Sequence, residues 1–376
     1  MFPFAQSIVL VACLALADGS ALADPSTKVA TTEIGELAGA SYRIDIPIKW
    51  NHELVVFYHG YEPFPKVFKK DEALSPMFDP LLARGYAVLQ SGYSAGGWAV
   101  EQGYTDTETL RQKFIRDHGK PKRSFVMGMS MGGTLTVMTI EQRPQIYAGA
   151  LSLCGVLEAT DSFLQHDFAF RAAFDYYFPD LLGTLVPVPD DYVPDDQVIL
   201  RILDALRGNP KASKALLSYY GVGNLEDVAA VTAFNTYDFK ELQHRAGGSP
   251  FDNSELIYTG SRDDDALNDG VKRYRADPKA RAYALRWYTP SGDLNRPMLA
   301  LHDVGDPLVI ASTTFEYAML AQRKGNGANF TQQYVKRSGH CVFEPAEIAN
   351  AFDELVNWVD SGKKPLSGAL PTAVAK

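Results

Sequence analysis

The sequence feature that most constrains the fold of this chain is the segment 123–133, where an apolar run leads into Gly128-x-Ser130-x-Gly132 and then into a helical pattern. A serine on a sharp turn between a strand and a helix needs a very small residue on either side, because a Cβ there leaves almost no room. Chance alone could supply these five residues, and a glycine-rich turn with a buried serine is the structural alternative. The rest of the chain therefore decides whether Ser130 is a nucleophile.

Strands and helices alternate around this turn. Two β-rich runs, 29–34 and 40–47, are expected to form antiparallel edge strands. Four almost wholly apolar runs are typical of parallel strands buried on both faces: 54–60, 86–90, 124–127 and 148–154. Thr105 and Glu108 form a capping box that predicts the start of a helix. The alternation predicts an α/β fold with a mostly parallel central sheet flanked by helices.

The alternation stops after Gly155. Residues 156–296 carry helix-like patterns rich in Phe and Tyr, which predict a large, mainly helical cap inserted after the sixth strand. Strands resume at 297–303 and 330–335, and a closing amphipathic helix follows. We therefore expect a core of residues 24–155 and 297–362, a cap of residues 156–296 and a flexible tail of residues 363–376.

Two loops late in the chain supply partners for Ser130. A serine hydroxyl needs a base to take its proton, and a carboxylate orients that base when it is a histidine. In an open parallel sheet such groups lie at the carboxyl ends of strands. Asp306 follows one late strand, and His340 is the histidine that follows the last one. We therefore predict a catalytic triad of Ser130, His340 and Asp306.

The order serine, acid, histidine, with each residue just beyond a strand, resembles the α/β-hydrolase superfamily of serine hydrolases. The resemblance covers residues 28–155 and 297–360, and the cap lies where that superfamily usually carries its lid. It implies the α/β-hydrolase fold and an acyl-enzyme on Ser130. The superfamily hosts many activities, so the resemblance does not name a substrate.

The acid of the triad has competing candidates. Asp306 is favoured because Gly-Asp-Pro resembles the superfamily's post-strand Asp-Pro pattern, whereas Asp303 occupies a position where relatives commonly have glycine. An acid in the preceding loop, Glu158 or Asp161, is a third possibility, because some members of the fold use one there.

A tetrahedral intermediate needs N–H donors aimed at its oxyanion. The backbone N–H of Met131, at the start of the helix, is one expected donor. The resemblance to the superfamily's His-Gly-x loop implies that the N–H of Tyr61, after His59 and Gly60, is the other. His59 itself is expected to brace that loop.

The chain has three cysteines, of which Cys13 falls in the apolar N-terminal segment. Cys154 and Cys341 can form a disulfide that ties the histidine loop to the sheet, or they can stay two independent buried thiols. Tannases and related feruloyl esterases have a cysteine after the catalytic histidine bonded to one before the serine. Met129 precedes Ser130 here, so that pattern is half present.

The N-terminus predicts export. An apolar run from Ile8 to Ala17 is followed by Ala21-Leu-Ala23. A run of this length suits the core of a signal peptide, whereas a membrane span needs about 20 apolar residues. Cleavage after Ala23 would give a secreted or periplasmic protein.

Composition and motifs exclude several classes of function. A net charge of −9 without a basic block disfavours nucleic-acid binding. No other stretch is long and apolar enough to span a bilayer. The sequence contains no His/Glu zinc motif, phosphate-binding glycine loop or dinucleotide fingerprint, so no metal or cofactor is expected. The acidic stretch 262–269 matches no EF-hand spacing and suits a solvated turn that caps a helix.

The sequence thus predicts an exported serine hydrolase that cleaves carboxylic esters of a small molecule or polymer, and it sets no oligomeric state. A serine peptidase or aminopeptidase of the same fold, and a non-catalytic binding protein that retains the fold, are the alternatives. The aromatic residues of the cap favour an apolar or aromatic substrate unless they form the cap's own core: Phe168, Phe170, Tyr176, Tyr177, Phe178, Tyr219 and Tyr220.

Overall fold

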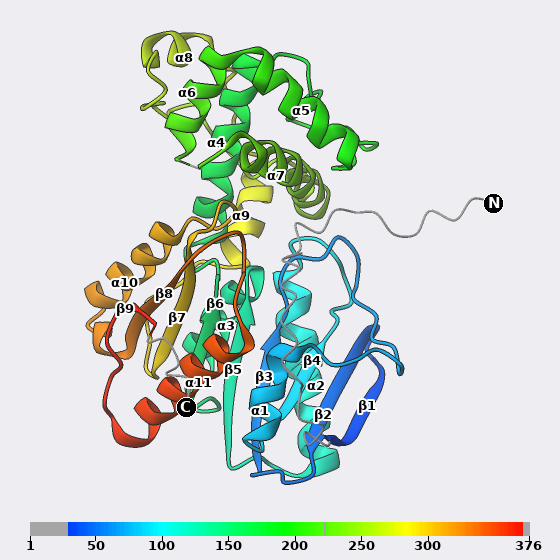
Figure 1. The fold of residues 1–376 in the computed structure, drawn as a ribbon. Helices are drawn as coiled ribbons and strands as arrows, with labels where there is room; N and C mark the ends of the chain where they lie inside the picture. The colour runs from blue at the N-terminus through cyan, green and yellow to red at the C-terminus, as the bar shows by residue number, and fades with distance from the viewer. Residues whose placement is uncertain (1–28, 222, 371–376) are drawn as a thin grey trace, which may run out of the picture. The chain divides into compact units, whose positions relative to one another are not determined.

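The structure of the chain, a computed structural model, describes residues 29–221 and 223–370. The predicted signal peptide, residues 1–23, lies outside the described residues. The described chain forms two compact units (Figure 1). The cap unit is Ala159–Thr289, and the core unit comprises residues 29–158 and 290–370.

The core unit is built on a nine-stranded sheet in the order β1-β2-β4-β3-β5-β6-β7-β8-β9. β2 pairs antiparallel with β1 and β4, and all other neighbouring strands pair parallel. The strands are β1 (Val29–Leu37), β2 (Ala40–Pro47), β3 (Glu53–Tyr58), β4 (Ala87–Ser91), β5 (Arg123–Met129), β6 (Gly149–Leu153), β7 (Met298–Gly305), β8 (Phe330–Ser338) and β9 (Gly368–Ala369). This arrangement confirms the predicted α/β-hydrolase fold.

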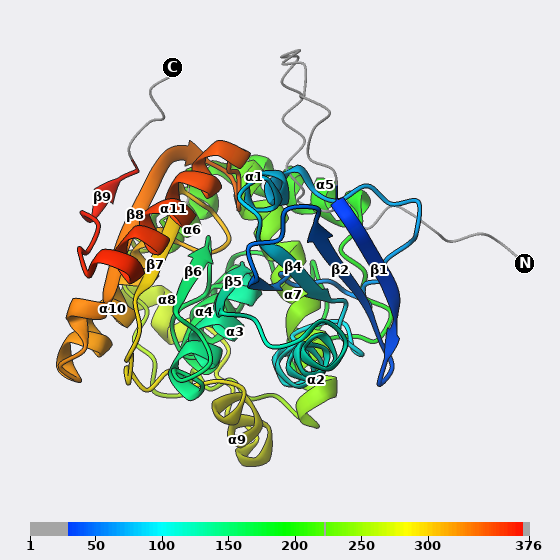
Figure 2. The ribbon, with the colours of Figure 1, turned by 90° about the horizontal axis from the view of Figure 1, so that it is seen from below.

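Helices cover both faces of the sheet, so the parallel strands between them are buried and can be apolar throughout. Figure 2 shows α1 and α11 on one face and α2 and α3 on the other. The core helices are α1 (Asp79–Ala83), α2 (Val100–His118), α3 (Met131–Gln142), α10 (Thr314–Arg323) and α11 (Pro345–Ser361), with short 3₁₀ helices at Pro76–Phe78, Ala311–Thr313 and Gly327–Asn329. Within residues 29–221 and 223–370, no helix combines the length and apolarity needed to cross a membrane.

The start of α2 differs from the prediction. The capping box predicts a helix that opens at Thr105, but α2 already begins at Val100. The Thr105 hydroxyl donates to the carbonyl oxygen of Glu101 at 3.0 Å, inside the helix. The Glu108 carboxylate accepts hydrogen bonds of 2.8 and 2.6 Å from the Arg111 guanidinium. Both side chains are occupied within the helix and do not cap it, so the predicted start is wrong.

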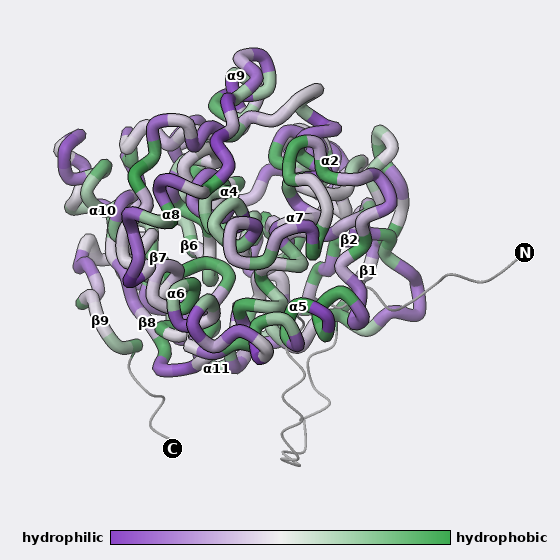
Figure 3. Tube along the Cα trace, turned by 90° about the horizontal axis from the view of Figure 1, so that it is seen from above, coloured by the Kyte–Doolittle hydropathy of each residue, from purple (hydrophilic) through white to green (hydrophobic). Residues whose placement is uncertain are grey.

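The cap unit contains the helices α4 (Thr160–Tyr177), α5 (Asp196–Gly208), α6 (Pro210–Tyr220), α7 (Leu225–Ala246), α8 (Asp264–Gly270) and α9 (Pro278–Arg286). Asp195 caps α5 by accepting the backbone N–H of Val198 at 2.9 Å. Apolar and polar residues alternate along α5 with helical spacing (Figure 3), and Ile202 and Leu206 are fully buried. The role of this unit as a lid stays a prediction.

Most of the aromatic residues in the cap form its own core. Phe168, Phe170 and Tyr220 are 0%, 1% and 3% exposed. The ring centroids of Phe168 and Phe251 lie 4.9 Å apart, and those of Phe170 and Tyr220 lie 4.3 Å apart. These rings pack the unit together, so they do not support an argument for an aromatic substrate.

The chain returns to the core unit earlier than predicted. The predicted cap is 156–296, whereas the cap unit ends at Thr289. The buried Glu141 carboxylate on α3 accepts hydrogen bonds from the backbone N–H groups of Ser291 and Gly292 at 2.8 and 2.7 Å. These bonds fix the returning segment to the core unit.

Part of the predicted flexible tail belongs to the sheet. Gly368 and Ala369 form β9 and pair with Gln333 and Tyr334 of β8. Leu370 is 8% exposed and packs with the hydrophobic core. The prediction of a flexible tail is therefore wrong for residues 368–370, and residues 371–376 lie outside the described residues.

We predict that Glu141→Ala lowers the free energy of unfolding by about 2–4 kcal/mol, because buried N–H groups lose a charged acceptor. The Tyr317 hydroxyl, which donates to Glu141 at 2.9 Å, loses the same acceptor. Glu141→Gln keeps an acceptor and should cost less. Urea denaturation followed by tryptophan fluorescence measures the change, with Glu36→Ala on the exposed edge of β1 as the control. An alanine variant as stable as the wild type would contradict the role of this carboxylate.

Candidate active site

Ser130 lies on a sharp turn between β5 and α3. Its backbone has φ 57° and ψ −124°, a conformation that residues other than glycine rarely adopt. A Cβ on Gly128 would lie 2.1 Å from the carbonyl oxygen of Gly132, and a Cβ on Gly132 would lie 2.2 Å from that of Tyr58. The turn therefore requires both glycines of the Gly-x-Ser-x-Gly pattern.

Ser130, His340 and Asp306 come together at the carboxyl ends of β5, β8 and β7. The Oγ atom of Ser130 lies 2.8 Å from Nε2 of His340, and Nδ1 of His340 lies 2.7 Å from Oδ2 of Asp306. With a proton on Nδ1, the imidazole donates to the carboxylate and leaves Nε2 to accept the serine proton. The arrangement can therefore activate Ser130 by general-base catalysis.

The surroundings of Asp306 keep it ionised. Its Oδ1 atom accepts the backbone N–H groups of Leu308 and Val309 at 2.9 and 3.0 Å. Burial by itself would raise the pKa of this carboxyl, but the charge of His340 and hydrogen bonds from His302 and His340 outweigh burial and lower the pKa to about 2. The carboxylate is therefore available to orient His340 across the neutral pH range.

The other candidate acids occupy different places. The Oδ2 atom of Asp303 accepts the backbone N–H of Val342 at 3.1 Å. Glu158 ends the first segment of the core unit, and Asp161 belongs to the cap unit. The carboxylate that contacts Nδ1 of His340 is that of Asp306.

The residues expected to supply oxyanion donors flank Ser130. Met131 is the first residue of α3, where backbone N–H groups lack partners inside the helix and the helix dipole is positive. Gly60 precedes Tyr61, and a Cβ on Gly60 would lie 3.0 Å from the Cβ of Ser130. The loop that carries Tyr61 thus passes beside the serine. The donor roles of Met131 and Tyr61 stay predictions.

His59 braces this loop, as expected from the sequence, and Tyr93 assists through contacts that no sequence pattern indicates. Their rings stack with centroids 3.8 Å apart, and Nδ1 of His59 lies 2.7 Å from the carbonyl oxygen of Gly60. The Tyr93 hydroxyl donates to the carbonyl oxygen of His59 at 3.1 Å. Burial lowers the pKa of His59 to about 3, so the ring is neutral near pH 7.

Cys154 and Cys341 form a disulfide, with their Cα atoms 5.3 Å apart. Cys154 follows β6, the strand beside β5, and Cys341 follows His340 directly. The bond therefore ties the histidine loop to the strand next to the one that carries Ser130. The partner of Cys341 comes from the end of β6, unlike the cysteine before the serine in tannases.

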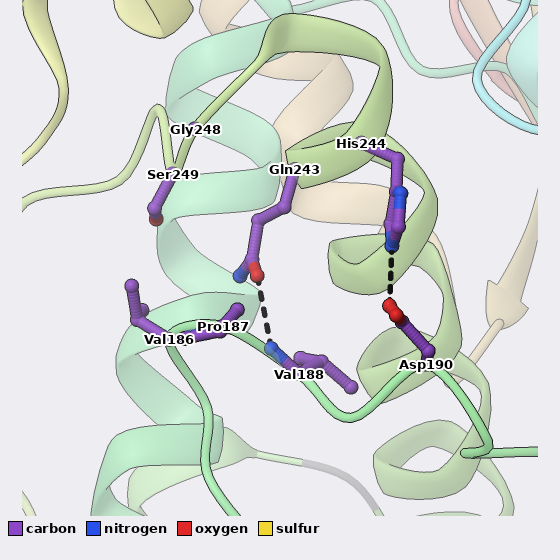
Figure 4. A pocket seen from close by; sticks show the side chains of 8 residues that line it. All are labelled: Val186, Pro187, Val188, Asp190, Gln243, His244, Gly248 and Ser249. Atoms are coloured by element: carbon purple, nitrogen blue, oxygen red, sulfur yellow. Dashed lines mark hydrogen bonds and ion pairs between the residues drawn. The ribbon is translucent and has the colours of Figure 1, made fainter.

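A pocket of about 370 Å³ lies within the cap unit (Figure 4). The apolar turn 186–188 forms one wall, and the Gln243 side chain accepts the backbone N–H of Val188 at 3.0 Å. His244 and Asp190 form an exposed pair at its rim, with Nε2 and Oδ1 2.8 Å apart. The Gln243 amide oxygen thus holds the turn.

Comparison with known proteins identifies hydrolases. Residues 95–179, which include the turn at Ser130, match the prolyl oligopeptidase family. An o-phthalyl amidase of Xanthobacter agilis is 22% identical over 412 aligned positions, covering 89% of this chain and 88% of that protein.

Solved structures with a similar course of the chain include an acylaminoacyl peptidase of Pyrococcus horikoshii, with a TM-score of 0.47 and 10% identity. The match covers 89% of this chain and 42% of the peptidase, so this chain spans less than half of the peptidase's length. An esterase of Pyrococcus furiosus has a TM-score of 0.46 and 12% identity, covering 86% of this chain and 91% of the esterase.

We predict that the double variant Cys154→Ser/Cys341→Ser reacts about tenfold more slowly with a fluorophosphonate, a reagent that labels activated serines. The disulfide spans a sequence separation of 187 residues, so its loss should also lower the free energy of unfolding by about 3–5 kcal/mol. The slower reaction follows because a freed loop holds His340 less well against Ser130. Labelling rates and urea denaturation measure the two effects.

Reduction with dithiothreitol supplies the matched control for this prediction. It should slow labelling of the wild type to the rate of the double variant and leave the double variant unchanged. Equal labelling rates for the oxidised and reduced wild type would show that the disulfide does not position His340.

Proposed function

We propose that this chain, which belongs to the α/β-hydrolase superfamily of serine hydrolases, cleaves carboxylic esters through an acyl-enzyme on Ser130. The observation that carries the proposal is the continuous line of contacts from Ser130 through His340 to Asp306, at 2.8 and 2.7 Å. The prolyl oligopeptidase match and the amidase relative agree with a hydrolase of this superfamily.

The proposed reaction has two halves. The Ser130 oxygen attacks the acyl carbon while His340 takes the hydroxyl proton, and the oxyanion forms beside the expected N–H donors of Met131 and Tyr61. The imidazolium, stabilised by Asp306, then protonates the departing alkoxide, which leaves as the alcohol. Water activated by His340 attacks the acyl-enzyme, releases the carboxylic acid and restores the serine hydroxyl.

Amide or peptide cleavage is the second candidate function. The printed name of the Xanthobacter agilis relative and the family matched by residues 95–179 favour it. An amine leaves only when it is protonated as the C–N bond breaks, which demands more from His340 than the departure of an alcohol. A triad that cleaves amides therefore also cleaves activated esters, so ester cleavage is the more general proposal.

We predict that the mature protein hydrolyses p-nitrophenyl esters with a higher kcat/KM than aminoacyl p-nitroanilides carrying matched acyl groups. The comparison is made spectrophotometrically, because both substrate series release a coloured product. A clear preference for the anilides would replace the ester proposal with the amide proposal. Inclusion of esters and amides of aromatic dicarboxylic acids tests the chemistry named by the amidase relative.

Ser130→Ala is the control that assigns either activity to this site. It should lower kcat by about 10⁴-fold or more and abolish fluorophosphonate labelling, because the covalent intermediate cannot form. Thr139→Ala on α3, the helix that follows Ser130, removes a buried hydroxyl that contacts Tyr58 at 2.9 Å and should leave labelling intact. A wild-type protein that binds esters without labelling or turnover would favour the non-catalytic binding protein.

Export is a further part of the proposed function. We predict that the chain produced with its own N-terminus in a Gram-negative host is recovered from the periplasm or medium and begins at Asp24, because the apolar segment before Ala23 is short. N-terminal sequencing of the purified protein measures the cleavage site. Recovery of the uncleaved chain from the cytoplasm would contradict export.

A further inference from the structure

We infer that Asp303 is a positioning residue for His340. It clamps the histidine loop, and it adds a second negative charge beside Asp306. The inference rests on the proposed function, because it assigns Asp303 a task in the reaction of Ser130. Asp303 is distinct from the triad acid, since its carboxylate binds the loop backbone and that of Asp306 binds the imidazole.

The clamp acts on the backbone of one residue of the histidine loop, Val342. Asp303, on β7, is 0% exposed, and its Oδ2 atom accepts the backbone N–H of Val342 at 3.1 Å. The carbonyl oxygen of Val342 accepts a hydrogen bond of 2.6 Å from the Arg337 guanidinium on β8. Val342 lies two residues after His340, so Asp303 and Arg337 fix the loop just beyond the catalytic imidazole.

An uncharged side chain could make the same bond to Val342. An asparagine at position 303 would offer an acceptor oxygen without the cost of burying a charge. The Oδ1 atom of Asp303 is buried and has no hydrogen-bond partner among the described residues. A carboxylate is therefore more than the clamp alone requires, and its charge needs a separate explanation.

The charge has a use during the reaction. Burial, followed by repulsion from Asp306, raises the pKa of Asp303 to about 6, so the group changes its charge close to neutral pH. The charged groups that interact with it are His302, Asp306, His340 and Arg337, and Arg337 also binds Glu347 at 2.8 Å. Once ionised, Asp303 favours the imidazolium that His340 becomes when it takes the serine proton.

Two variants separate the clamp from the charge. Asp303→Asn keeps an acceptor for Val342 and removes the charge, whereas Asp303→Ala removes both. Asp353→Asn is the matched control, because it removes one surface carboxylate that pairs with Arg84 at 2.6 Å. For each protein, kcat, KM and the fluorophosphonate labelling rate are measured between about pH 4 and 9.

The acid limb of the pH profile is the range in which the labelling rate falls as the pH is lowered. We expect this limb to move to lower pH by about 0.5 unit or more in Asp303→Asn, because a nearby carboxylate no longer favours the protonated imidazole. The shift itself is the expected signature, because a neutral residue at position 303 lowers the affinity of His340 for its own proton. At its optimum, Asp303→Asn should lose about threefold in kcat and Asp303→Ala about tenfold or more, with similar KM values.

A purely structural role of Asp303 would leave the pH profile unchanged, so this profile is the decisive measurement. A profile of Asp303→Asn that superimposes on those of the wild type and Asp353→Asn would overturn the inference and leave the proposed function intact. If Asp303→Ala fails to fold, the pH profile of Asp303→Asn, which keeps the acceptor for Val342, decides the inference by itself. A wild type without labelling or turnover would refute the proposed function, and the role of Asp303 would fall with it.

Discussion

The backbone of Ser130 is held in an uncommon conformation, and the geometry of the site depends on that hold. A residue in such a conformation costs about 1–3 kcal/mol, which the surrounding structure must offset. The N–H of Ser130 donates to the carbonyl oxygen of Leu153 on β6 at 3.0 Å, and its carbonyl oxygen accepts from Gly133 and Val156 at 2.7 and 3.2 Å. The hydrogen bonds to β6 and α3 therefore fix the position of the Oγ atom of Ser130, and His340 and Asp306 are aligned against this fixed atom.

Two carboxylates three residues apart then acquire opposite properties from their neighbours. Asp306 accepts two backbone N–H groups and faces His340, and its pKa falls to about 2. Asp303 accepts one backbone N–H, and burial followed by repulsion from Asp306 raises its pKa to about 6. The histidines separate them, because the charge of His340 and hydrogen bonds from His302 and His340 stabilise the charged form of Asp306, whereas burial and the charge of Asp306 dominate at Asp303. One group can thus act as a permanent anion while the other responds to pH.

Local patterns predicted the parts of the site that are determined locally. The two glycines of the Gly-x-Ser-x-Gly pattern predicted the turn at Ser130. The positions of the serine, the acid and the histidine, each just beyond a strand, predicted the triad. Asp303 lies on β7 and Asp306 just beyond it. The Gly-Asp-Pro pattern favoured Asp306 as the acid, and the contact of its Oδ2 atom with Nδ1 of His340 agrees with that prediction. The predicted start of α2 was wrong because the helix extends back to the fully buried Val100, ahead of the local capping signal at Thr105. A strand of two residues, β9, leaves no sequence pattern to detect.

The ties on the histidine loop connect the site to the compartment in which the protein works. His340 lies on a loop, and loops are more mobile than the strands they join. The disulfide from Cys341 and the bonds to Val342 compensate by attaching the loop to three strands. A disulfide persists in oxidising compartments and is reduced in the cytosol, so one of these ties holds only where the chain is exported. Export and an aligned His340 are therefore linked, because the leader sequence that we propose delivers the chain to the environment in which its active site is fully fixed.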